Sequence, residues 1–583
     1  HFTEAFRIRT LFDRAGLPFS WERIGALRLT QGRLKEAAQF TAMAIQAADR
    51  LAPSFPKFQL IHQRGEIERA RGETDAALKD FEEAADLASS WRRETLPAIE
   101  TLTATNVELE NGVFTSLVET AAYKAVARMD RSSAIRAFEA LEQNRAASLR
   151  EAAGRNFQNG IPVQYWDLLG ELRAEQARLL HTKQAGDAAL DRVRAKLTEM
   201  ESEIGLRTFP KKEENFRSQN SLIHFQQVLS NSELFLSFYL GEQESYVWAV
   251  TKDTFSLYRL GRAEEIRAAT NRFRDAVRSG DPAAAQFGEV VYRQLFAGLS
   301  AGEVSRPDWV ISAGDALLEA PLAALVTQRK GSGLKYLVEQ HSLRLVPGAM
   351  SLAEPAKEAG SKQWLGVGDP VYNQADTRLR RHASGSFSWF ARASSPQLNR
   401  LVGSAEELRT GAQSWGAPAT ILEGSEATRE RFQSEIARHP AVIHLATHVL
   451  VSPQRRDQAL IAFGLDRKGE GQFLTTADVA MLSVPGAVVT MAGCETGTGE
   501  IRAGAGLVGL TRAWQIAGAR AVIATLWPVP DSRGELFSSF YHHLREMPAA
   551  QAMRLAQVEM IRSGTWRASA QYWGAYQVNG GAQ

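Results

Sequence analysis

Two stretches of the sequence decide how the second half of the chain is interpreted: Ala441-Val442-Ile443-His444-Leu445-Ala446-Thr447-His448 and Val488-Val489-Thr490-Met491-Ala492-Gly493-Cys494-Glu495-Thr496-Gly497. Each begins as a short apolar run rich in β-branched residues, which predicts a buried strand. Each ends in polar side chains at the point where the strand would end. In sheets of parallel strands, ligands bind beyond the carboxyl ends of the strands. The two stretches therefore predict a site to which one contributes a histidine and the other a cysteine.

The two histidines of the first stretch differ in their position on the strand. Side chains alternate along a strand, so His444 and His448 share one face. His444 lies inside the predicted strand, where we expect a packed and hydrogen-bonded core residue. His448 lies at the end of the strand, where a substrate can reach it, and it is the candidate base.

Cys494 is the single cysteine of the chain, and cysteine is usually a buried and unreactive residue. Its neighbours favour a reactive thiol, because Gly493 and Gly497 let backbone approach a substrate and Glu495 is polar where a core strand would stay apolar. A thiol beside an imidazole can transfer its proton and attack as a thiolate. The expected reaction is acyl transfer, in which backbone N–H groups hold the oxyanion, His448 protonates the departing amine and water hydrolyses the thioester.

At residues 444–448 and 493–497 the chain resembles the CHAT family of caspase-like cysteine peptidases, whose clan also holds caspases, separases and gingipains and whose name refers to an association with tetratricopeptide repeats. The resemblance extends over residues 215–580 and includes residues 312–315, 321–325, 366–370 and 525–531. It implies an α/β caspase-like fold and a catalytic dyad of Cys494 and His448. It further implies an oxyanion hole formed by the backbone of Val449, Gly493 and Cys494. The implied setting is bacterial signalling or defence, in which a partner releases the peptidase to cut a dedicated protein.

Two positions depart from the family pattern. Val449 replaces the glycine that usually follows the catalytic histidine, and Ala492 replaces a serine or asparagine before Gly493. Valine retains an N–H but lacks the backbone freedom of glycine, so either the site accepts an extended backbone there or activity is impaired. The alternative to an active cysteine endopeptidase is therefore a catalytically inactive CHAT pseudoenzyme that acts as a protein-binding scaffold.

Three acidic side chains are candidates for a substrate pocket: Glu495, Asp478 and Asp531. The resemblance implies that charges in the pocket select the residue before the scissile bond. We expect a preference for a basic or a bulky apolar residue there.

The first part of the chain is repetitive. Four small residues, Gly25, Gly32, Ala37 and Ala44, recur at one common offset as Gly65, Gly72, Ala77 and Ala84. Small residues let two helices cross closely, and Phe81 is expected to fill the space between the helices of the second copy, where the first copy has Thr41. A third copy is recognisable only by its second helix, with Ala134, Phe138 and Leu141.

The pattern resembles tetratricopeptide repeats, and the alternative is a helical bundle without repeats. Because such helix pairs need about three copies to bury a core, we expect further repeats before His1. Stacked repeats present a concave surface, which predicts a regulatory protein partner or a protein substrate bound there.

We expect a multidomain chain of five segments. Residues 1–155 form the tetratricopeptide-like repeats, and residues 156–214 form connecting helices, with a coiled-coil partner surface as the alternative. Residues 215–375 are the N-terminal, pseudo-caspase-like half of the CHAT region and residues 401–583 the catalytic half. Residues 376–400 form a flexible basic loop between them, where self-processing is a further alternative. The fold class is thus α-helical repeats followed by an α/β fold with a mostly parallel sheet flanked by helices.

Charge and cysteine content exclude several classes of function. Lys plus Arg number 68 and Asp plus Glu 66, a net charge of +2, so the chain as a whole has no attraction for nucleic acid or for an anionic membrane. One cysteine can form neither an internal disulfide nor a thiolate metal cluster, which favours a reducing, cytoplasmic location. No apolar run approaches the length of a membrane span.

Two short motifs suggest cofactors but lack the required context. Residues 504–509 match the glycine fingerprint of dinucleotide-binding folds, yet the first glycine does not follow a strand directly and no acidic residue ends the next strand. The alternative that the chain is a nucleotide-dependent switch protein rests on this motif alone. His444 and His448 have the spacing of a zinc-binding helix, but their segment is a predicted strand and lacks the glutamate. We therefore predict neither a cofactor nor a metal.

Overall fold

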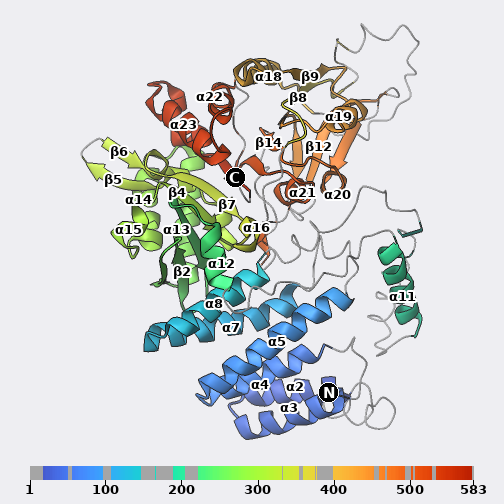
Figure 1. The fold of residues 1–583 in the computed structure, drawn as a ribbon, viewed down its shortest axis with the longest axis vertical. Coiled ribbons are helices and arrows are strands. Elements are labelled where there is room, and N and C mark those ends of the chain that lie inside the picture. The colour runs from blue at the N-terminus through green and yellow to red at the C-terminus, as the bar shows by residue number, and fades with distance from the viewer. Residues whose placement is uncertain are drawn as a thin grey trace. The chain divides into compact units, whose positions relative to one another are not determined.

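The computed structural model describes residues 17–49, 56–95, 107–145, 164–165, 168, 188–203, 221–330, 333–353, 359–373, 376, 378, 398–451, 459–466, 469, 471–492, 501–502, 506–507, 509–527, 529 and 534–580. The chain divides into two compact units, His1–Gln219 and Asn220–Gln583, and each is described by itself. Figure 1 shows helices in the first unit and both strands and helices in the second. Of the helices in the described ranges, none combines the length and the apolarity needed to cross a bilayer.

The first unit contains three helix pairs. They are α2 (Leu17–Thr30) with α3 (Leu34–Ala48), α4 (Lys57–Ala70) with α5 (Thr74–Thr95), and α7 (Val107–Arg128) with α8 (Arg131–Asn144). Each helix packs on the next one along the chain (Figure 1). The turn within each pair contains a residue with a left-handed backbone, namely Gly32 (φ 70°), Gly72 (φ 80°) and Met129 (φ 51°). The predicted tetratricopeptide-like repeats are confirmed, and the third pair contains both of its helices. A further helix, α11 (Ala188–Glu203), lies in the segment predicted to hold connecting helices.

The helices of each pair cross closely at the predicted glycines. A Cβ atom on Gly65 would lie 2.6 Å from the ring of Phe81, and one on Gly25 would lie 2.9 Å from Oγ1 of Thr41. Phe81 and Thr41 therefore fill equivalent spaces in the two copies, as expected from the sequence. Phe138 is likewise fully buried in α8.

Replacement of Gly65 by alanine tests this close crossing. We expect Gly65→Ala to destabilise the first unit by about 1–3 kcal/mol, because the new methyl group must displace a buried ring. Gly112→Ala is the matched control, since it also lies within a helix but its Cβ would meet only His62, at 3.8 Å. This control should be neutral or stabilising by up to about 1 kcal/mol. Hydrogen exchange of α4 and α5 measures both variants, and equal protection in the two would contradict the packing described.

The second unit is built around one 11-stranded sheet. From one edge to the other its strands are β3 (Phe255–Leu260), β2 (Ser245–Val250), β1 (Glu233–Tyr239), β4 (Asp308–Ser312), β7 (Ser342–Val346), β18 (Tyr576–Asn579), β17 (Ala521–Thr525), β14 (Val488–Met491), β10 (Val442–Ala446), β8 (Trp364–Pro370) and β9 (Ala419–Gly424). Neighbouring strands are parallel except in the pairs β1–β2, β2–β3 and β17–β18. Smaller sheets are formed by β11 (Val449–Val451), β12 (Ala459–Leu465) and β13 (Gly471–Thr475), by β5 (Val326–Lys330) and β6 (Gly333–Tyr336), and by β15 (Ile501–Arg502) and β16 (Gly506–Leu507).

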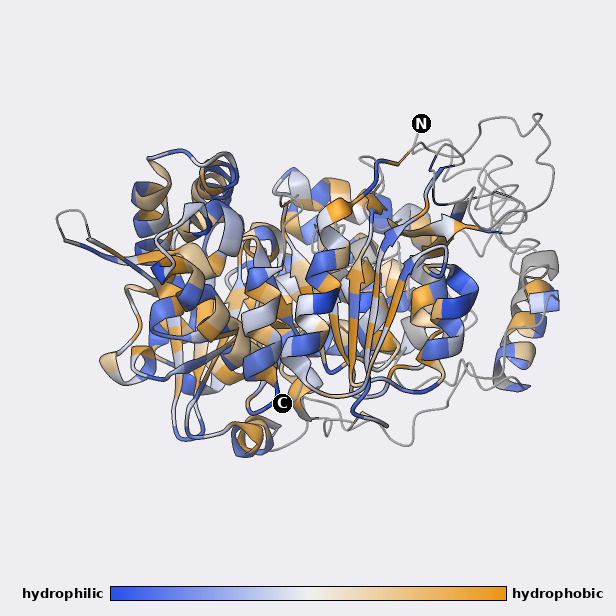
Figure 2. Ribbon diagram, turned by 90° about the horizontal axis from the view of Figure 1, so that it is seen from above, coloured by the Kyte–Doolittle hydropathy of each residue, from blue (hydrophilic) through white to orange (hydrophobic). Residues whose placement is uncertain are grey.

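Helices cover both faces of the large sheet. Around β8, β10 and β14, one face is covered by α18 (Val402–Trp415) and α22 (Glu535–Leu544), and the other by α19 (Arg429–Ile436), α20 (Thr476–Ala480) and α21 (Leu510–Ile516). The remaining helices are α12 (Ser221–Val228), α13 (Ala263–Ser279), α14 (Ala284–Phe296), α15 (Ala301–Val304), α16 (Met350–Ala353), α23 (Ala549–Arg562) and α24 (Ala570–Trp573). The strands of the sheet are largely apolar, whereas the helices carry hydrophilic faces (Figure 2). The predicted α/β fold with a mostly parallel sheet flanked by helices is confirmed.

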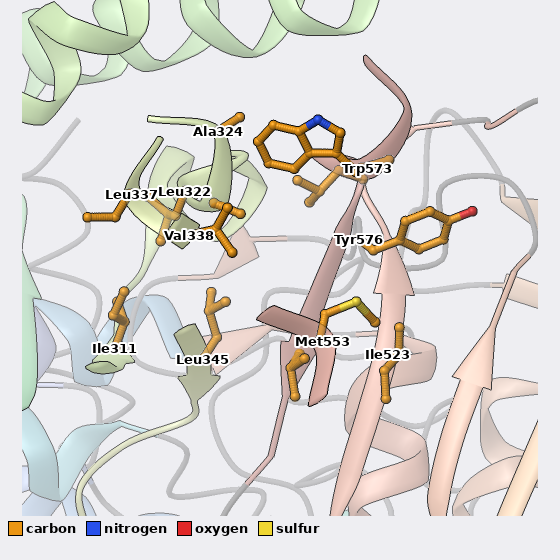
Figure 3. Packing of buried hydrophobic residues seen from close by; sticks show 14 of the residues in the cluster. Ile311, Leu322, Ala324, Leu337, Val338, Leu345, Ile523, Met553, Trp573 and Tyr576 are labelled. Atoms are coloured by element: carbon orange, nitrogen blue, oxygen red, sulfur yellow. The ribbon is translucent and has the colours of Figure 1, made fainter. Parts of the chain in front are cut away.

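Strand β18 reverses the direction of the sheet. It runs parallel to β7 and antiparallel to β17. Leu345 of β7, Ile523 of β17 and Tyr576 of β18 pack beside Met553 and Trp573 at this junction (Figure 3). The strands β8, β10, β14 and β17 consequently run in one direction, so their carboxyl ends lie together along one margin of the sheet. The strands β1, β4 and β7 run in the opposite direction, and their carboxyl ends lie along the opposite margin. The stretches that hold His448 and Cys494 both follow strands of the first set.

Candidate functional site

Strands β8, β10 and β14 are adjacent, parallel and aligned in register. His444 of β10 pairs with Gly366 of β8 and with Thr490 of β14. The backbone N–H of Ala492 donates to the carbonyl of Leu445 at 3.0 Å, so β14 stays beside β10 to its end. The two stretches singled out in the sequence therefore leave the sheet side by side. Of the predicted site residues, Gly493, Cys494, Glu495 and Asp531 lie outside the described residues, whereas His448, Val449 and Asp478 lie within them.

His448 is held by two neighbouring segments. Its ring nitrogen Nε2 lies 2.8 Å from the backbone carbonyl oxygen of Asn399, and its backbone N–H donates to the hydroxyl oxygen of Tyr372 at 3.2 Å. The rings of His448 and Tyr372 lie 5.1 Å apart. A carbonyl oxygen can only accept, so this contact requires the proton on Nε2 and leaves Nδ1 of the neutral imidazole as an acceptor. The arrangement thus selects the tautomer that can take a proton at Nδ1.

Tyr372 follows β8 and forms a buried wall beside His448. Burial raises the pKa of Tyr372 well above its ordinary value of 10.0, and the nearby Asp369 carboxylate raises it further. The phenol therefore stays neutral around neutral pH, and its oxygen accepts from the backbone N–H of His448.

Asp369 lies at the end of β8 with a left-handed backbone, φ 44°, which is uncommon for a residue other than glycine. It is only 3% exposed. Its carboxylate accepts two hydrogen bonds from Arg400, at 2.8 and 2.7 Å, and one from Arg378 at 2.8 Å. Its backbone N–H donates to the hydroxyl oxygen of Ser404 at 2.8 Å. Asp369 lies within residues 366–370, one of the stretches that resemble the CHAT family, but the sequence indicated no role for it.

The glycines that precede Asp369 let α18 lie close to β8. A Cβ atom on Gly366 would lie 2.9 Å from Leu408 of α18, and one on Gly368 would lie 2.8 Å from the same side chain. Larger residues at either position would push α18 outward. The close approach brings Ser404 and Glu407 of α18 within reach of Asp369 and of β10.

Val449 begins β11 and has an extended backbone. It is 7% exposed, and its side chain belongs to the apolar cluster on the α21 side of the sheet. Val449 pairs with Ile461 of β12, while the N–H of Ala462 donates to the carbonyl of His448 at 2.9 Å. In this register Val449 and Ile461 form a non-hydrogen-bonded pair, so the N–H of Val449 points away from β12. The sequence left open whether valine fits at this position, and an extended backbone is the conformation that suits it.

His444 is a fully buried core residue, as predicted. Its Nε2 lies 2.7 Å from a carboxylate oxygen of Glu407 on α18, and its Nδ1 lies 2.8 Å from the hydroxyl of Tyr541 on α22. Burial raises the pKa of Tyr541 well above 10.0, so the phenol keeps its proton and donates it to Nδ1. Nε2 then carries the ring proton and donates to Glu407. The network joins β10 to both helices on this face.

Asp478 has a structural role at the start of α20. Its carboxylate accepts from the backbone N–H and the hydroxyl of Thr475, both at 2.8 Å, and from Arg429 at 3.1 Å. The backbone N–H of Asp478 donates in return to the hydroxyl oxygen of Thr475 at 3.1 Å, which completes a capping box. The carboxylate is thus engaged within the second unit, and a contribution to a substrate pocket stays a prediction.

Sequence reasoning missed the residues that surround His448. Asn399, Tyr372 and Arg400 lie in segments without a motif of their own, and Asn399 acts through its backbone, which leaves no trace in residue type. The one available signal was the Gly-x-Gly-Asp pattern of residues 366–369, because two glycines before a buried acid indicate a close approach of backbone.

Replacement of Tyr541 by phenylalanine tests the buried network. We expect Tyr541→Phe to destabilise the second unit by about 1–3 kcal/mol, because Nδ1 of His444 then lacks a donor in a site without water access. Tyr292→Phe serves as the control, since its hydroxyl has no hydrogen-bond partner among the described residues, and it should change stability by less than about 0.5 kcal/mol. Urea unfolding of the full chain measures both. An equal effect of the two variants would show that the network contributes nothing.

Comparison with known proteins finds a similar curated sequence and similar solved structures. Tetratricopeptide repeat protein 28 of Homo sapiens is 26% identical over 295 residues, which cover 43% of this chain and 11% of the human protein. The chain thus spans only a small part of this curated relative. Gingipain R, an Arg-specific cysteine proteinase, gives a TM-score of 0.31 with 8% identity over 54% of this chain and 75% of that chain. Separase in its complex with securin from Saccharomyces cerevisiae gives a TM-score of 0.40 with 9% identity over 99% of this chain and 48% of that chain.

The family comparison covers the whole candidate site. The model of the CHAT domain matches residues 285–581, slightly more than half of the chain, and this range includes β8, β10, β14 and the stretches that hold His448 and Cys494. The chain is therefore a member of the CHAT domain family.

Proposed function

We propose that the chain is a caspase-like cysteine endopeptidase in which Cys494 is the nucleophile and His448 the general base. The observation that carries the proposal is the alignment of β10 with β14. Cys494 follows Ala492 by two residues, and His448 follows Ala446 by two residues. Two residues span at most about 7 Å, and paired strands lie about 4.8 Å apart. Cys494 and His448 are therefore attached by short segments to the ends of two adjacent strands, which keeps the thiol and the imidazole within reach of each other.

The contacts of His448 suit it to this role. With its proton on Nε2 and the carbonyl of Asn399 accepting that proton, the free Nδ1 can accept the proton of the Cys494 thiol. The thiolate then attacks the scissile carbonyl carbon, and the protonated His448 returns the proton to the departing amine. Water, deprotonated by His448, attacks the thioester, and Cys494 leaves as a thiolate that regains its proton.

An oxyanion hole can be formed by backbone N–H groups next to both catalytic residues. The N–H of Val449 is not used by the β11–β12 ladder and is a candidate donor, together with those of Gly493 and Cys494. Fixed donors of this kind are effective because they need no reorganisation when charge develops on the oxygen.

The remaining features of the proposal concern partners and setting. The helical repeats bind a regulatory protein or present the substrate, since stacked helix pairs expose extended surfaces. Glu495, Asp531 and Asp478 are the candidates for a substrate pocket, and a basic or bulky apolar residue is preferred before the scissile bond. The family suggests signalling or defence in the bacterial cytoplasm, a compartment that keeps a lone thiol reduced.

A pseudoenzyme scaffold is the second candidate function, and the observation that favours it is the valine at position 449. The extended backbone of β11 argues against impairment, because valine adopts that conformation readily. The two functions differ in one property, the reactivity of Cys494.

Labelling with an acyloxymethylketone probe distinguishes the two functions. We expect the full chain to be labelled at Cys494, and labelling to fall at least about 100-fold in His448→Ala, because the thiol loses its base. His542→Ala, which removes an exposed histidine of α22, should label like the wild type. Peptide mapping by mass spectrometry locates the label. A thiol that stays unreactive while the regulator is bound to the chain would contradict the peptidase and favour the scaffold.

Val449→Gly tests the departure from the family pattern. We expect loss of stability of about 2–3 kcal/mol, because a buried side chain is removed, with no gain in the rate of Cys494 labelling, because the N–H is retained. Labelling kinetics and urea unfolding measure the two effects. A labelling rate that rises at least about tenfold in Val449→Gly would mean that valine impairs the wild-type site.

A further inference from the structure

The carbonyl that contacts His448 is fixed by the residue that follows it in the chain. Asn399 accepts from Nε2 of His448 through its backbone oxygen. The next residue, Arg400, places its guanidinium on the Asp369 carboxylate with two parallel hydrogen bonds, from Nε at 2.8 Å and from Nη2 at 2.7 Å. A paired contact of this kind restricts both distance and orientation. The ion pair therefore limits how far the Asn399 carbonyl can move.

A second connection ties the same segment to Asp369. The hydroxyl of Ser404 donates to the carbonyl of Leu401 at 2.7 Å and accepts from the backbone N–H of Asp369 at 2.8 Å. The chain just beyond Asn399 is thus attached to Asp369 through both a side chain and a backbone group. The backbone of Asp369 has φ 44°, a conformation that persists in a residue other than glycine only where the surroundings enforce it.

Asp369 and His448 are placed by the same pair of strands. Gly368 of β8 pairs with Ala446 of β10, and Asp369 and His448 follow these residues by one and two positions. The strand pairing fixes where Asp369 stands relative to His448, and the ion pair holds Arg400, the residue next to Asn399, at Asp369. Asp369 is buried and both Arg378 and Arg400 contact its carboxylate, so it is a fixed point to which the Asn399 segment is attached.

We propose that Asp369 is a positioning residue for His448: through Arg400 it holds the Asn399 carbonyl on Nε2 and so maintains the tautomer with a free Nδ1. Asp369 does not touch the reacting atoms. Its consequence for catalysis rests on the proposed function, but its effect on the tautomer of His448 does not.

Asp369→Asn and Arg400→Gln test the proposal in the full chain. Both keep the approximate shape of the side chain and remove the charge, and Arg400 is 48% exposed, so its replacement leaves folding intact even where Asp369→Asn does not. Asp376→Asn is the matched control, because the Asp376 carboxylate accepts from Arg378 and has no hydrogen bond to Arg400 among the described residues.

The first measurement is the tautomer of His448, read from the ring nitrogen shifts of ¹⁵N-histidine-labelled protein at a pH of about 8, where histidine is ordinarily neutral. Comparison with His448→Gln assigns the signals. In the wild type and in Asp376→Asn we expect widely separated shifts with the proton on Nε2. In Asp369→Asn and Arg400→Gln the two shifts should approach each other, because both tautomers become populated. Wild-type shifts of His448 in Arg400→Gln would overturn the proposal.

The second measurement is the rate of Cys494 labelling. Supporting groups of this type typically change activity by about 10–100-fold when they are lost, and we expect a decrease of that size in both variants with unchanged probe affinity. If the wild type is not labelled at all, the proposed peptidase fails while the nitrogen shifts still decide the positioning role. If the wild type is labelled and Arg400→Gln is labelled equally fast, the positioning role fails while the peptidase stands.

Discussion

The parallel pairing of β10 with β8 and β14 is the interaction on which the candidate site depends. It places His444 between Gly366 and Thr490 and sends the following segments out of the sheet at one edge. A slip of one residue would exchange the faces of β10 and move His448 to the other side. The bonds of His444 to Glu407 and Tyr541 oppose such a slip, because an apolar neighbour moved into that position could satisfy neither group. The buried His444 thus fixes the place of the half-buried His448.

The close approach of α18 to β8 links this core to the edge of the sheet. Gly366 and Gly368 provide the space, and α18 then contributes Glu407 beneath the sheet and Ser404 near its edge. Both the network around His444 and the attachment of the Asn399 segment depend on this one helix. The two glycines and Asp369 thus face the same helix from neighbouring positions of β8.

Sequence reasoning recovered what is encoded locally. The positions of the two histidines along β10 separated His444 from His448, and the small residues at one common offset identified the helical repeats, because both patterns can be read from residue type and spacing alone. The position of β18 between β7 and β17 could not be seen, since a short strand at the end of the chain gives no signal for its neighbours. The contact of Asn399 with His448 was also out of reach, because it uses a backbone oxygen from a segment without periodicity. Long-range pairing and backbone groups are the parts that residue type does not record.

Val449 shows how a departure from a family pattern can be judged once the backbone is known. Glycine at this position would hold an N–H in place only at the expense of its conformational freedom. Valine is stiff, prefers extended backbone and packs into the apolar cluster beside Ile461, so the orientation of its N–H follows from strand pairing rather than from flexibility. A donor fixed before the substrate arrives is the condition under which a backbone N–H stabilises an oxyanion most strongly. Under the proposed function, the substitution keeps the candidate donor and changes how it is held.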